Sequence, residues 1–323
     1  MKAIRIHRFG STEEVLEYED VPAPTPAPGE LLVKVEAASL NRADLSLRGG
    51  KYRVRPEDLP LIPGREFAGT VAALGNTVRD FRAGERVVAQ PGLGGYAEYA
   101  VTNTSYARPL PEGVDFVPAS AMPTIFLTSW FGLVEEGGMK PGDRVLIQAG
   151  SSGVGIAAIQ IAKHVGTWVV TTTGSDEKCR RLREVGADEA VNYISKDFKE
   201  EVSHLTGGKG VDIVLEMIGG DVYTKSLEIL SPGGRLVSIG GAFGPIPDPA
   251  PPLSDGRRAS RFSITTYLSA HPEAFKQMDL FLELVRQKQF QVVIDRTFPL
   301  AEARAAQRYL EGRDHFGKIV LTI

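Results

Sequence analysis

The stretch VLIQAGSSGVG, residues 145–155, decides how the middle of this 323-residue chain folds. It begins with an apolar run of the kind that forms a buried parallel strand. Glycine-rich residues follow, and Gly166 marks a natural end for the helix that comes next. The apolar residues between recur at helical spacing: Val154, Ala158, Ile161, Ala162 and Val165. A strand that passes through glycines into a helix predicts one unit of a parallel α/β sheet.

The same alternation continues downstream. WVVTT (168–172) predicts the next strand, and residues 176–185 predict a helix with Ser175 as its N-cap and Gly186 beyond its end. AVNY (190–193), VDIVLEMIG (211–219) and GRLVSIG (234–240) predict three further strands. Repeated strand–helix units indicate an α/β fold with a doubly wound parallel sheet.

The first third of the chain is rich in predicted strands instead. LLVKVEA (31–37), GTVAAL (69–74) and RVVA (86–89) are bounded by glycine or proline, which suggests a barrel or folded sheet. VPAPTPAPGE (21–30) is interpreted as a surface connection. After the proline-rich residues 245–252 come two predicted helices, FLELVRQKQF and AEARAAQRYL. The final strand KIVLTI can return to the first domain.

Composition excludes several classes of function. With 37 basic and 40 acidic residues the net charge is −3, and no block of like charge supports a nucleic-acid or membrane partner. The only cysteine, Cys179, excludes an intrachain disulfide and any metal site that needs two thiolates. The first ten residues lack the apolar core of a signal peptide, and no run reaches the ~18 apolar residues of a membrane span. We therefore expect a cytoplasmic protein.

The glycine-rich turn is the central motif, because a strand precedes it and a helix follows it. Glycines let the backbone approach a pyrophosphate, and the helix N-terminus offers amides and a positive dipole to the phosphates. The predicted phosphate-binding residues are Gly150, Ser151, Ser152, Gly153, Val154 and Gly155. Ser152 stands where the usual motif has its middle glycine, so an ordinary glycine turn is the alternative. The context favours a dinucleotide.

The end of the second strand indicates which dinucleotide binds. An NAD site typically has Asp or Glu about 20 residues past the glycines. That place here holds four uncharged residues: Thr172, Thr173, Gly174 and Ser175. Lys178 lies in the next helical turn, where an ammonium can reach a 2′-phosphate, and Arg181 is a second candidate. Asp176 and Glu177 argue mildly against this, and Lys178 can also be a solvated surface residue. The pattern favours NADPH.

These motifs resemble the quinone oxidoreductase-like members of the medium-chain dehydrogenase/reductase superfamily over essentially the whole length. Besides the glycine-rich turn, the resemblance rests on LNRADL (40–45), PGREFAGTV (63–71), GERV (84–87), GGYAEYA (94–100), LTSW (127–130) and GRDHFGKIVLTI (312–323). It implies a GroES-like catalytic domain from residues 1–120 and 263–323, a Rossmann domain over 121–262, and a cofactor in the interdomain cleft. It also implies a homodimer or tetramer, and GRLVSIG is a candidate edge strand for pairing across a twofold axis.

The resemblance also indicates whether this protein has the residues to bind zinc. Zinc-dependent relatives carry a cysteine before the stretch matching LNRAD and a histidine in a G-H-E motif. This chain has Leu40 and Asn41 in the first place and Arg65 before Glu66 in the second. The structural zinc lobe has no counterpart either, and the five histidines show no ligand spacing: His7, His164, His204, His271 and His315. No metal is expected.

In related quinone reductases, the residues matching Asn41 and Tyr52 face the nicotinamide. Asn41 is therefore a candidate donor to cofactor or substrate, and Tyr52 a candidate donor or general acid. The alternatives are a turn residue and a half-buried aromatic. Arg65 is a candidate for stabilising negative charge on the acceptor, with an ion pair to Glu66, Asp44 or another carboxylate as the alternative. Asp44 is expected to hold its loop together.

The resemblance implies further cofactor-binding residues. They are Thr128 near the nicotinamide phosphate, Tyr193 near the adenosine phosphate, Ile218 with Gly219, then Gly240, Gly241, Ala242, Tyr267 and Lys318. Without zinc, an electron-poor acceptor is easier to reduce than a simple alcohol is to oxidise. We therefore expect NADPH-dependent hydride transfer to a small-molecule quinone or enone by a homodimer. A 2-enal or enoyl reductase, a non-catalytic NADPH-binding protein and a zinc alcohol dehydrogenase are the alternatives.

Overall fold

The computed structural model describes residues 1–52, 54–242, 244–248 and 250–323. The chain divides into two compact units. Unit 1 combines Met1–Thr124 with Leu268–Ile323, and unit 2 is Ile125–Tyr267. Among the described residues, no helix has the length and apolar character needed to cross a membrane.

Unit 2 is built on a six-stranded parallel sheet with the strand order β10-β9-β8-β11-β12-β13. Its strands are β8 (Arg144–Ile147), β9 (Trp168–Thr173), β10 (Glu189–Asn192), β11 (Val211–Glu216), β12 (Leu230–Ser238) and β13 (Arg258–Arg261). The order reverses between β8 and β11, the switch point where open α/β sheets bind ligands at the carboxyl ends of their strands. The predicted doubly wound sheet is confirmed.

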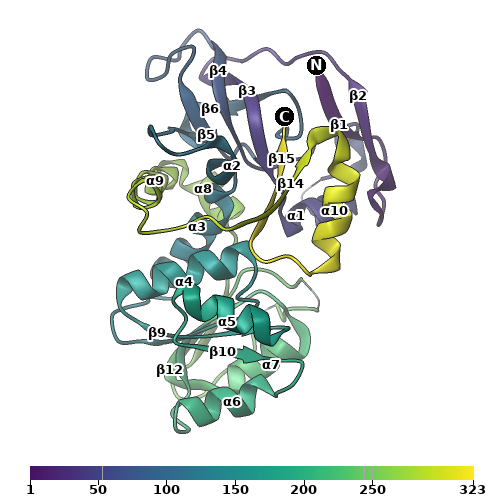
Figure 1. Ribbon diagram of the computed structural model, residues 1–323. Helices are drawn as coiled ribbons and strands as arrows, with labels where there is room; N and C mark the ends of the chain where they lie inside the picture. The colour runs from purple at the N-terminus through teal and green to yellow at the C-terminus, as the bar shows by residue number, and fades with distance from the viewer. Residues whose placement is uncertain (53, 243, 249) are drawn as a thin grey trace. The chain divides into compact units, whose positions relative to one another are not determined.

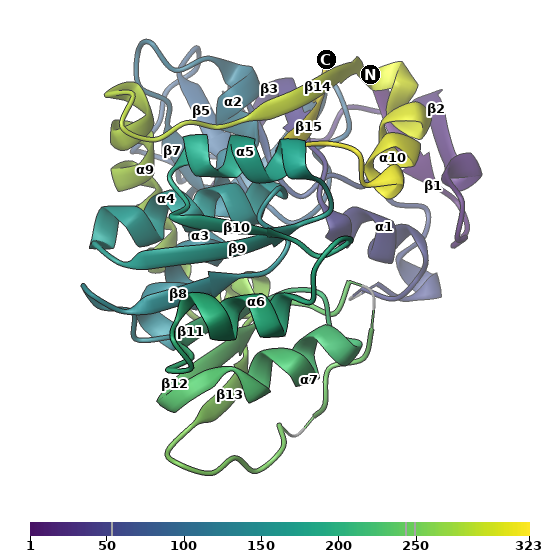
Figure 2. The same ribbon diagram turned by 60° about the horizontal axis from the view of Figure 1, so that its bottom comes forward.

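Helices cover both faces of this sheet. Helices α4 (Gly153–Val165) and α5 (Asp176–Val185) lie on one face, and α6 (Phe198–Leu205) and α7 (Gly220–Glu228) on the other (Figures 1 and 2). Local chemistry sets their ends: Ser175 caps α5, and Gly166 ends α4 with a left-handed φ of 91°. The predicted helix over residues 176–185 is confirmed.

One detail of the predicted sheet is wrong. GRLVSIG falls largely within β12, which is an interior strand because β13 pairs with it in parallel along Arg235–Ser238. The edge strand is instead Arg258–Arg261, whose sequence RASR has no apolar pattern from which a strand could be predicted.

Unit 1 contains a seven-stranded sheet in the order β14-β15-β3-β4-β5-β7, with β6 also paired to β3. These are β3 (Glu30–Ser39), β4 (Phe67–Leu74), β5 (Arg86–Ala89), β6 (Tyr99–Asn103), β7 (Ala107–Pro109), β14 (Ile294–Pro299) and β15 (Lys318–Thr322). A separate hairpin pairs β1 (Lys2–Ile6) with β2 (Leu16–Asp20). Strand β15 runs antiparallel to β3, which confirms that the last strand returns to the N-terminal sheet.

Helices complete unit 1 and join it to unit 2. Unit 1 contains α1 (Arg42–Arg48), α2 (Phe116–Ser120), α9 (Met278–Arg286) and α10 (Ala303–Gly312), while α3 (Met122–Trp130) and α8 (Ile264–Ala270) cross the unit boundaries. Helix α1 starts directly after β3, and β15 lies beside β3. Residues from both ends of the chain therefore meet where β3 ends.

Candidate functional site

The glycine-rich turn of unit 2 is packed so closely that side chains are excluded. A Cβ added to Gly150 would lie 2.0 Å from Thr171 Oγ1, and one added to Gly155 would lie 2.5 Å from the carbonyl oxygen of Ala149. Ser152 has an extended backbone and caps α4, with its Oγ accepting a hydrogen bond from the Gly155 amide at 3.0 Å. A serine in place of the middle glycine therefore suits this turn, because an N-cap favours an extended residue with a side-chain acceptor.

A buried hydroxyl close to this turn lacks a protein partner. Ser129 of α3 donates through Oγ to the carbonyl of Val154 at 3.1 Å, which holds α3 against the first turn of α4. The neighbouring Thr128 is 7% exposed, and its Oγ1 has no hydrogen-bond partner among the described residues. A closely packed glycine turn, a helix N-terminus and an unsatisfied hydroxyl together fit the phosphates of a dinucleotide.

The residues predicted to select the cofactor lie together at the end of β9. Thr173 Oγ1 lies 3.2 Å from Ser151 Oγ, so this strand end contacts the glycine-rich turn. A Cβ on Gly174 would lie 3.0 Å from the Tyr193 hydroxyl. Ser175 accepts from the Lys178 amide at 3.2 Å and so starts α5.

The nearest acidic residue faces another strand. The Asp176 carboxylate accepts a hydrogen bond from Asn192 Nδ2 at 2.8 Å, which holds it on β10. The end of β9 therefore carries hydroxyls and a glycine, and Lys178 follows in the first turn of α5.

The remaining predicted residues of unit 2 follow β11 and β12. The Ala242 amide donates to the Met217 carbonyl at 3.2 Å, which joins Gly240, Gly241 and Ala242 to the turn containing Ile218. A Cβ on Gly219 would lie 2.2 Å from the carbonyl oxygen of Gly244, so this turn also requires glycine. Tyr267 lies in an aromatic cluster, with its ring 4.6 Å from that of Phe131 and 5.7 Å from that of Phe262.

Glu216 organises these two strand ends and was not predicted. It is fully buried, and it accepts hydrogen bonds from the amides of Ile218 and Gly219, the latter at 2.8 Å, and from Ser238 Oγ at 3.2 Å. Burial raises the pKa of Glu216, and the hydrogen bonds from Gly219, Ile218 and Ser238 offset this only in part. A charged residue at the end of the apolar run VDIVLE was the signal that could have identified it.

Unit 1 contains a second polar cluster, centred on the fully buried Glu66. One carboxylate oxygen, Oε1, accepts from Ser39 Oγ, from Asn41 Nδ2 at 2.9 Å and from Lys318 Nζ at 3.2 Å. The other, Oε2, accepts from the Thr124 amide at 2.6 Å. Burial alone would raise the pKa of Glu66, but Lys318 and these hydrogen bonds lower it below its usual value. Glu66 is therefore an ionised carboxylate at neutral pH.

Lys318 contacts this cluster with its whole ammonium group. Nζ donates to the Leu40 carbonyl at 2.6 Å, to Asn41 Oδ1 at 2.7 Å and to Glu66 Oε1 at 3.2 Å. The contact of Lys318 with the cofactor stays a prediction, and in this structure its three bonds use all three hydrogens of an ammonium. Its position is set by β15, which lies beside β3.

The other two predicted catalytic residues contact each other. The Arg65 guanidinium lies over the Tyr52 ring, 4.9 Å from its centre, and Arg65 is 4% exposed. Nearby, the buried Asp44 accepts from the Tyr96 hydroxyl at 2.8 Å and from the Asn41 amide at 2.8 Å. Burial raises the pKa of Asp44, an effect that Arg65 and these bonds oppose. Asp44 therefore holds the start of α1, as expected.

Sequence reasoning missed Ser39 and Thr124 and named Glu66 only as an ion-pair partner. The available signal was a charged residue directly before the apolar strand that begins at Phe67. A cluster that joins Glu66 to Lys318 across 252 positions of sequence has no local pattern.

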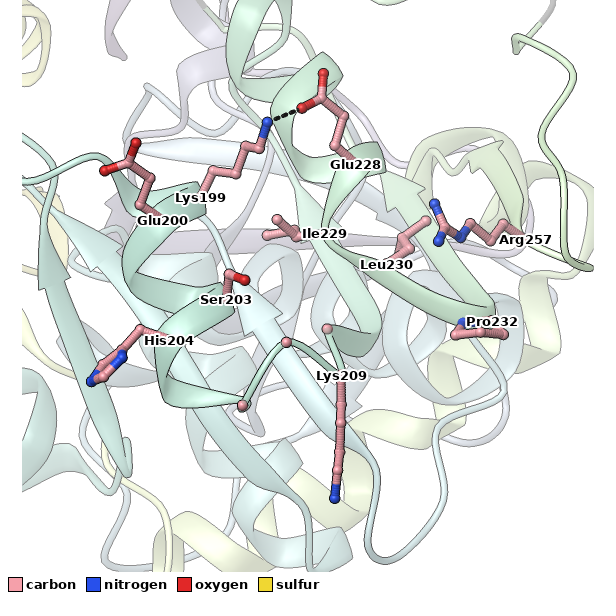
Figure 3. Close-up of a pocket in the computed structure, with 13 residues that line it drawn as sticks. Lys199, Glu200, Ser203, His204, Lys209, Glu228, Ile229, Leu230, Pro232 and Arg257 are labelled. Atoms are coloured by element: carbon pink, nitrogen blue, oxygen red, sulfur yellow. Dashed lines mark hydrogen bonds and ion pairs between the residues drawn. The ribbon is translucent and has the colours of Figure 1, made fainter.

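A hollow of about 850 Å³ lies at the amino ends of β11 and β12, whereas the glycine-rich turn follows the carboxyl end of β8; Figure 3 shows the residues that line the hollow. It is lined by α6, residues 207–210, residues 228–232 and Arg257, and Lys199 pairs with Glu228 there. Because dinucleotides bind at the carboxyl ends of parallel strands, this hollow does not belong to the predicted cofactor site.

The fold and these residues define a two-unit protein with a nucleotide-binding Rossmann sheet. Residues 27–112 match the family described as alcohol dehydrogenase GroES-like domain, and residues 153–283 match the family described as zinc-binding dehydrogenase. The chain is 33% identical to a quinone oxidoreductase of Sus scrofa, with 100% of this chain and 98% of that protein covered. It is also 33% identical to a 2-haloacrylate reductase of Burkholderia sp, with 98% and 97% covered.

Solved structures of a quinone oxidoreductase and of a dehydrogenase are also similar to this chain over its whole length. A structure of Escherichia coli quinone oxidoreductase complexed with NADPH matches with a TM-score of 0.92 and 28% identity, with 100% of both chains covered. A structure described as an NAD-dependent alcohol dehydrogenase matches with a TM-score of 0.90 and 33% identity, again over 100% of both chains. The chain belongs to the quinone oxidoreductase-like members of the medium-chain dehydrogenase/reductase superfamily.

Proposed function

We propose that this protein is an NADPH-dependent oxidoreductase that reduces quinones or activated α,β-unsaturated carbonyls by hydride transfer, without a metal. The observation that carries the cofactor choice is the end of β9. Thr173, Gly174 and Ser175 carry no carboxylate there, Asp176 is bonded to Asn192 of β10, and Lys178 lies in the first turn of α5. The quinone oxidoreductase and 2-haloacrylate reductase relatives support the acceptor class.

Unit 2 supplies the binding groups. We assign the pyrophosphate to Gly150 through Gly155, with the Thr128 hydroxyl as an additional donor, and the 2′-phosphate to Ser175, Lys178 and Tyr193. Thr173 and Gly174 shape this turn, and the turns at Ile218 and at Gly240, Gly241 and Ala242 complete the cofactor edge, with Tyr267 assigned to it by resemblance. When bound, NADPH provides the hydride that reduces the acceptor carbon.

Unit 1 supplies the groups for the acceptor. Hydride addition to a quinone or enone places negative charge on oxygen, and a positioned hydrogen-bond donor stabilises that charge. Asn41 and Tyr52 are the proposed donors. Arg65, stacked on Tyr52, holds the phenol ring and places a positive charge beside it. A phenol hydroxyl next to a guanidinium is suited to donate to a developing oxyanion.

The cluster around Glu66 argues against zinc. A zinc site uses thiolate, imidazole or carboxylate ligands, but this cluster offers one carboxylate among a hydroxyl, an amide and an ammonium. Lys318 already compensates the charge of Glu66, so a divalent cation placed there would meet a buried positive charge. Zinc independence is therefore part of the proposal, although the matching family is described as zinc-binding.

We further propose a cytoplasmic homodimer. The single cysteine is in keeping with a reducing compartment. Strand β13 ends the unit 2 sheet and presents an edge that can pair with a second copy.

A spectrophotometric screen of NADPH consumption tests the function. The panel contains quinones, 2-enals, enones and simple aldehydes, each repeated with NADH and with a chelator. We expect turnover with quinones or activated alkenes, a preference for NADPH and no effect of the chelator. Tight NADPH binding without turnover would identify a non-catalytic binding protein, and loss of activity with chelators would identify a zinc dehydrogenase.

A further inference from the structure

The three bonds of Lys318 constrain Asn41 more tightly than a turn requires. Lys318 is 5% exposed, Asn41 8% and Glu66 0%, so the ion pair and the amide are shielded from water together. Asn41 Oδ1 faces the ammonium at 2.7 Å, and Asn41 Nδ2 faces the carboxylate at 2.9 Å. The amide therefore bridges the two charges of a buried salt bridge.

This bridge fixes which way the amide faces. An ammonium only donates hydrogen bonds, and a carboxylate only accepts them. Turning the Asn41 amide by 180° would place its NH₂ against Lys318 and its oxygen against Glu66, which loses both bonds and sets like groups against each other. The backbone cannot shift to compensate, because the backbone N–H of Asn41 donates to the Asp44 carboxylate at 2.8 Å. In the observed orientation one of the two Nδ2 hydrogens goes to Glu66, and among the described residues the second has no acceptor.

We propose that Lys318 is a positioning residue for the reduction, which acts by locking the Asn41 amide so that its second Nδ2 hydrogen is presented in one fixed direction. The ammonium itself does not bind the cofactor, because its three hydrogens are committed to Leu40, Asn41 and Glu66. This inference rests on the proposed function, since it assigns that hydrogen to the negative charge that develops on the acceptor.

Loss of the Lys318 bonds should lower the turnover number without weakening NADPH binding. Loss of Lys318 removes one of the two bonds that fix the Asn41 amide, and replacing Glu66 by glutamine as well leaves the amide free to rotate, because a glutamine can donate or accept. Removal of a fixed donor to a developing oxyanion costs roughly 10²–10³ in rate, so loosening one should lower kcat by about 10-fold or more. NADPH affinity should change by less than about twofold, because no hydrogen of Lys318 reaches the cofactor.

Four variants test this: Lys318→Met, Lys318→Arg, the double variant Lys318→Met with Glu66→Gln, and the control Lys34→Met. Lys318→Met removes the charge and leaves Glu66 buried without its partner, which endangers folding. The double variant removes both buried charges together, so no unpaired charge remains to destabilise the fold. A glutamine at position 66 can donate or accept, so it no longer fixes the orientation of the Asn41 amide. Lys34 is an exposed lysine on β3 whose ammonium pairs with Glu36.

Circular dichroism first establishes folding, and then NADPH affinity, kcat and KM for the acceptor are measured separately. We expect a folded double variant with near-normal NADPH affinity and a kcat lowered about 10-fold or more. Lys318→Arg, which keeps the charge and the donors, should retain a clearly higher kcat than Lys318→Met, and Lys34→Met should match the unaltered protein.

Two results would overturn the inference while leaving the proposed function intact. One is a folded double variant with an unchanged kcat. The other is a loss of NADPH affinity in Lys318→Met as large as its loss of kcat, which would make Lys318 a cofactor ligand. An unaltered protein that reduces no acceptor would instead remove the proposed function, and this inference with it.

Discussion

Gly150→Ala should destabilise unit 2 through a single contact. The added Cβ would lie 2.0 Å from Thr171 Oγ1 and 3.1 Å from Thr171 Cβ and Cγ2. Thr171 is fully buried and donates to the Ile147 carbonyl at 2.7 Å, so it cannot rotate away without losing that bond. Overpacking costs about 1–3 kcal/mol and a lost hydrogen bond about 0.5–1.5 kcal/mol, which together give about 2–4 kcal/mol.

A double-mutant cycle with Thr171→Ala isolates this contact. Thr171→Ala removes Oγ1 and Cγ2, so only the tight 3.1 Å approach to Cβ remains in the double variant. The double variant should therefore be more stable than the sum of the two single changes predicts, by about 1 kcal/mol or more.

Urea unfolding followed by tryptophan fluorescence measures this effect in the relevant unit, because both tryptophans, Trp130 and Trp168, lie in unit 2. Gly312→Ala is the control, since its added Cβ meets nothing within 4 Å. The same variants are titrated with NADPH, and Gly150→Ala should bind it more weakly. Strict additivity, or a Gly150→Ala protein as stable as the control, would refute the close packing on which the turn depends.

Three other predictions concern single residues. Lys178→Ala should weaken NADPH binding about 10- to 150-fold, the equivalent of about 1.5–3 kcal/mol for a hydrogen bond to a charged group, and leave NADH within about twofold. Lys199→Ala, in the hollow at the amino ends of β11 and β12, is the control and should change the affinity for neither cofactor. Equal losses of NADPH and NADH affinity in Lys178→Ala would exclude the phosphate role of Lys178. Tyr52→Phe should lower kcat about 10²-fold or more with little change in NADPH affinity, and unchanged turnover would exclude a donor role. Because burial raises the pKa of Glu216, the stability of the folded protein falls as pH rises from 4.5 through that raised pKa. Glu216→Gln does not titrate, so in urea unfolding it should gain stability over the unaltered protein across that window, and a constant difference would contradict this.

The parts of the fold that were predicted from sequence are those with strong local signals. An apolar run followed by a glycine turn and a helical period specified β8 and α4, and Ser175 with Gly186 marked both ends of α5. The return of the last strand to the first domain was also predicted, although its pairing with β3 was not. Helix α7 was not predicted, because it begins at Gly220 directly after Gly219, and two glycines resemble a turn.

Other features depend on contacts that are distant in sequence. Strand β13 is a strand because it pairs with β12, since its own residues carry no alternation. The lock on Asn41 joins residues 277 positions apart, and the stacking of Arg65 on Tyr52 depends on how the first domain folds. Chemistry-bearing residues could therefore be named from motifs, but their partners required the fold.

The most direct test of the account is the equilibrium affinity of the unaltered protein for NADPH and for NADH. Energy transfer from the unit 2 tryptophans to the reduced nicotinamide can measure both without any acceptor. The arrangement of Ser175, Lys178 and Tyr193 predicts that NADPH binds at least about 10-fold more tightly, as one added charge-assisted hydrogen bond requires. Equal affinities, or tighter binding of NADH, would contradict it.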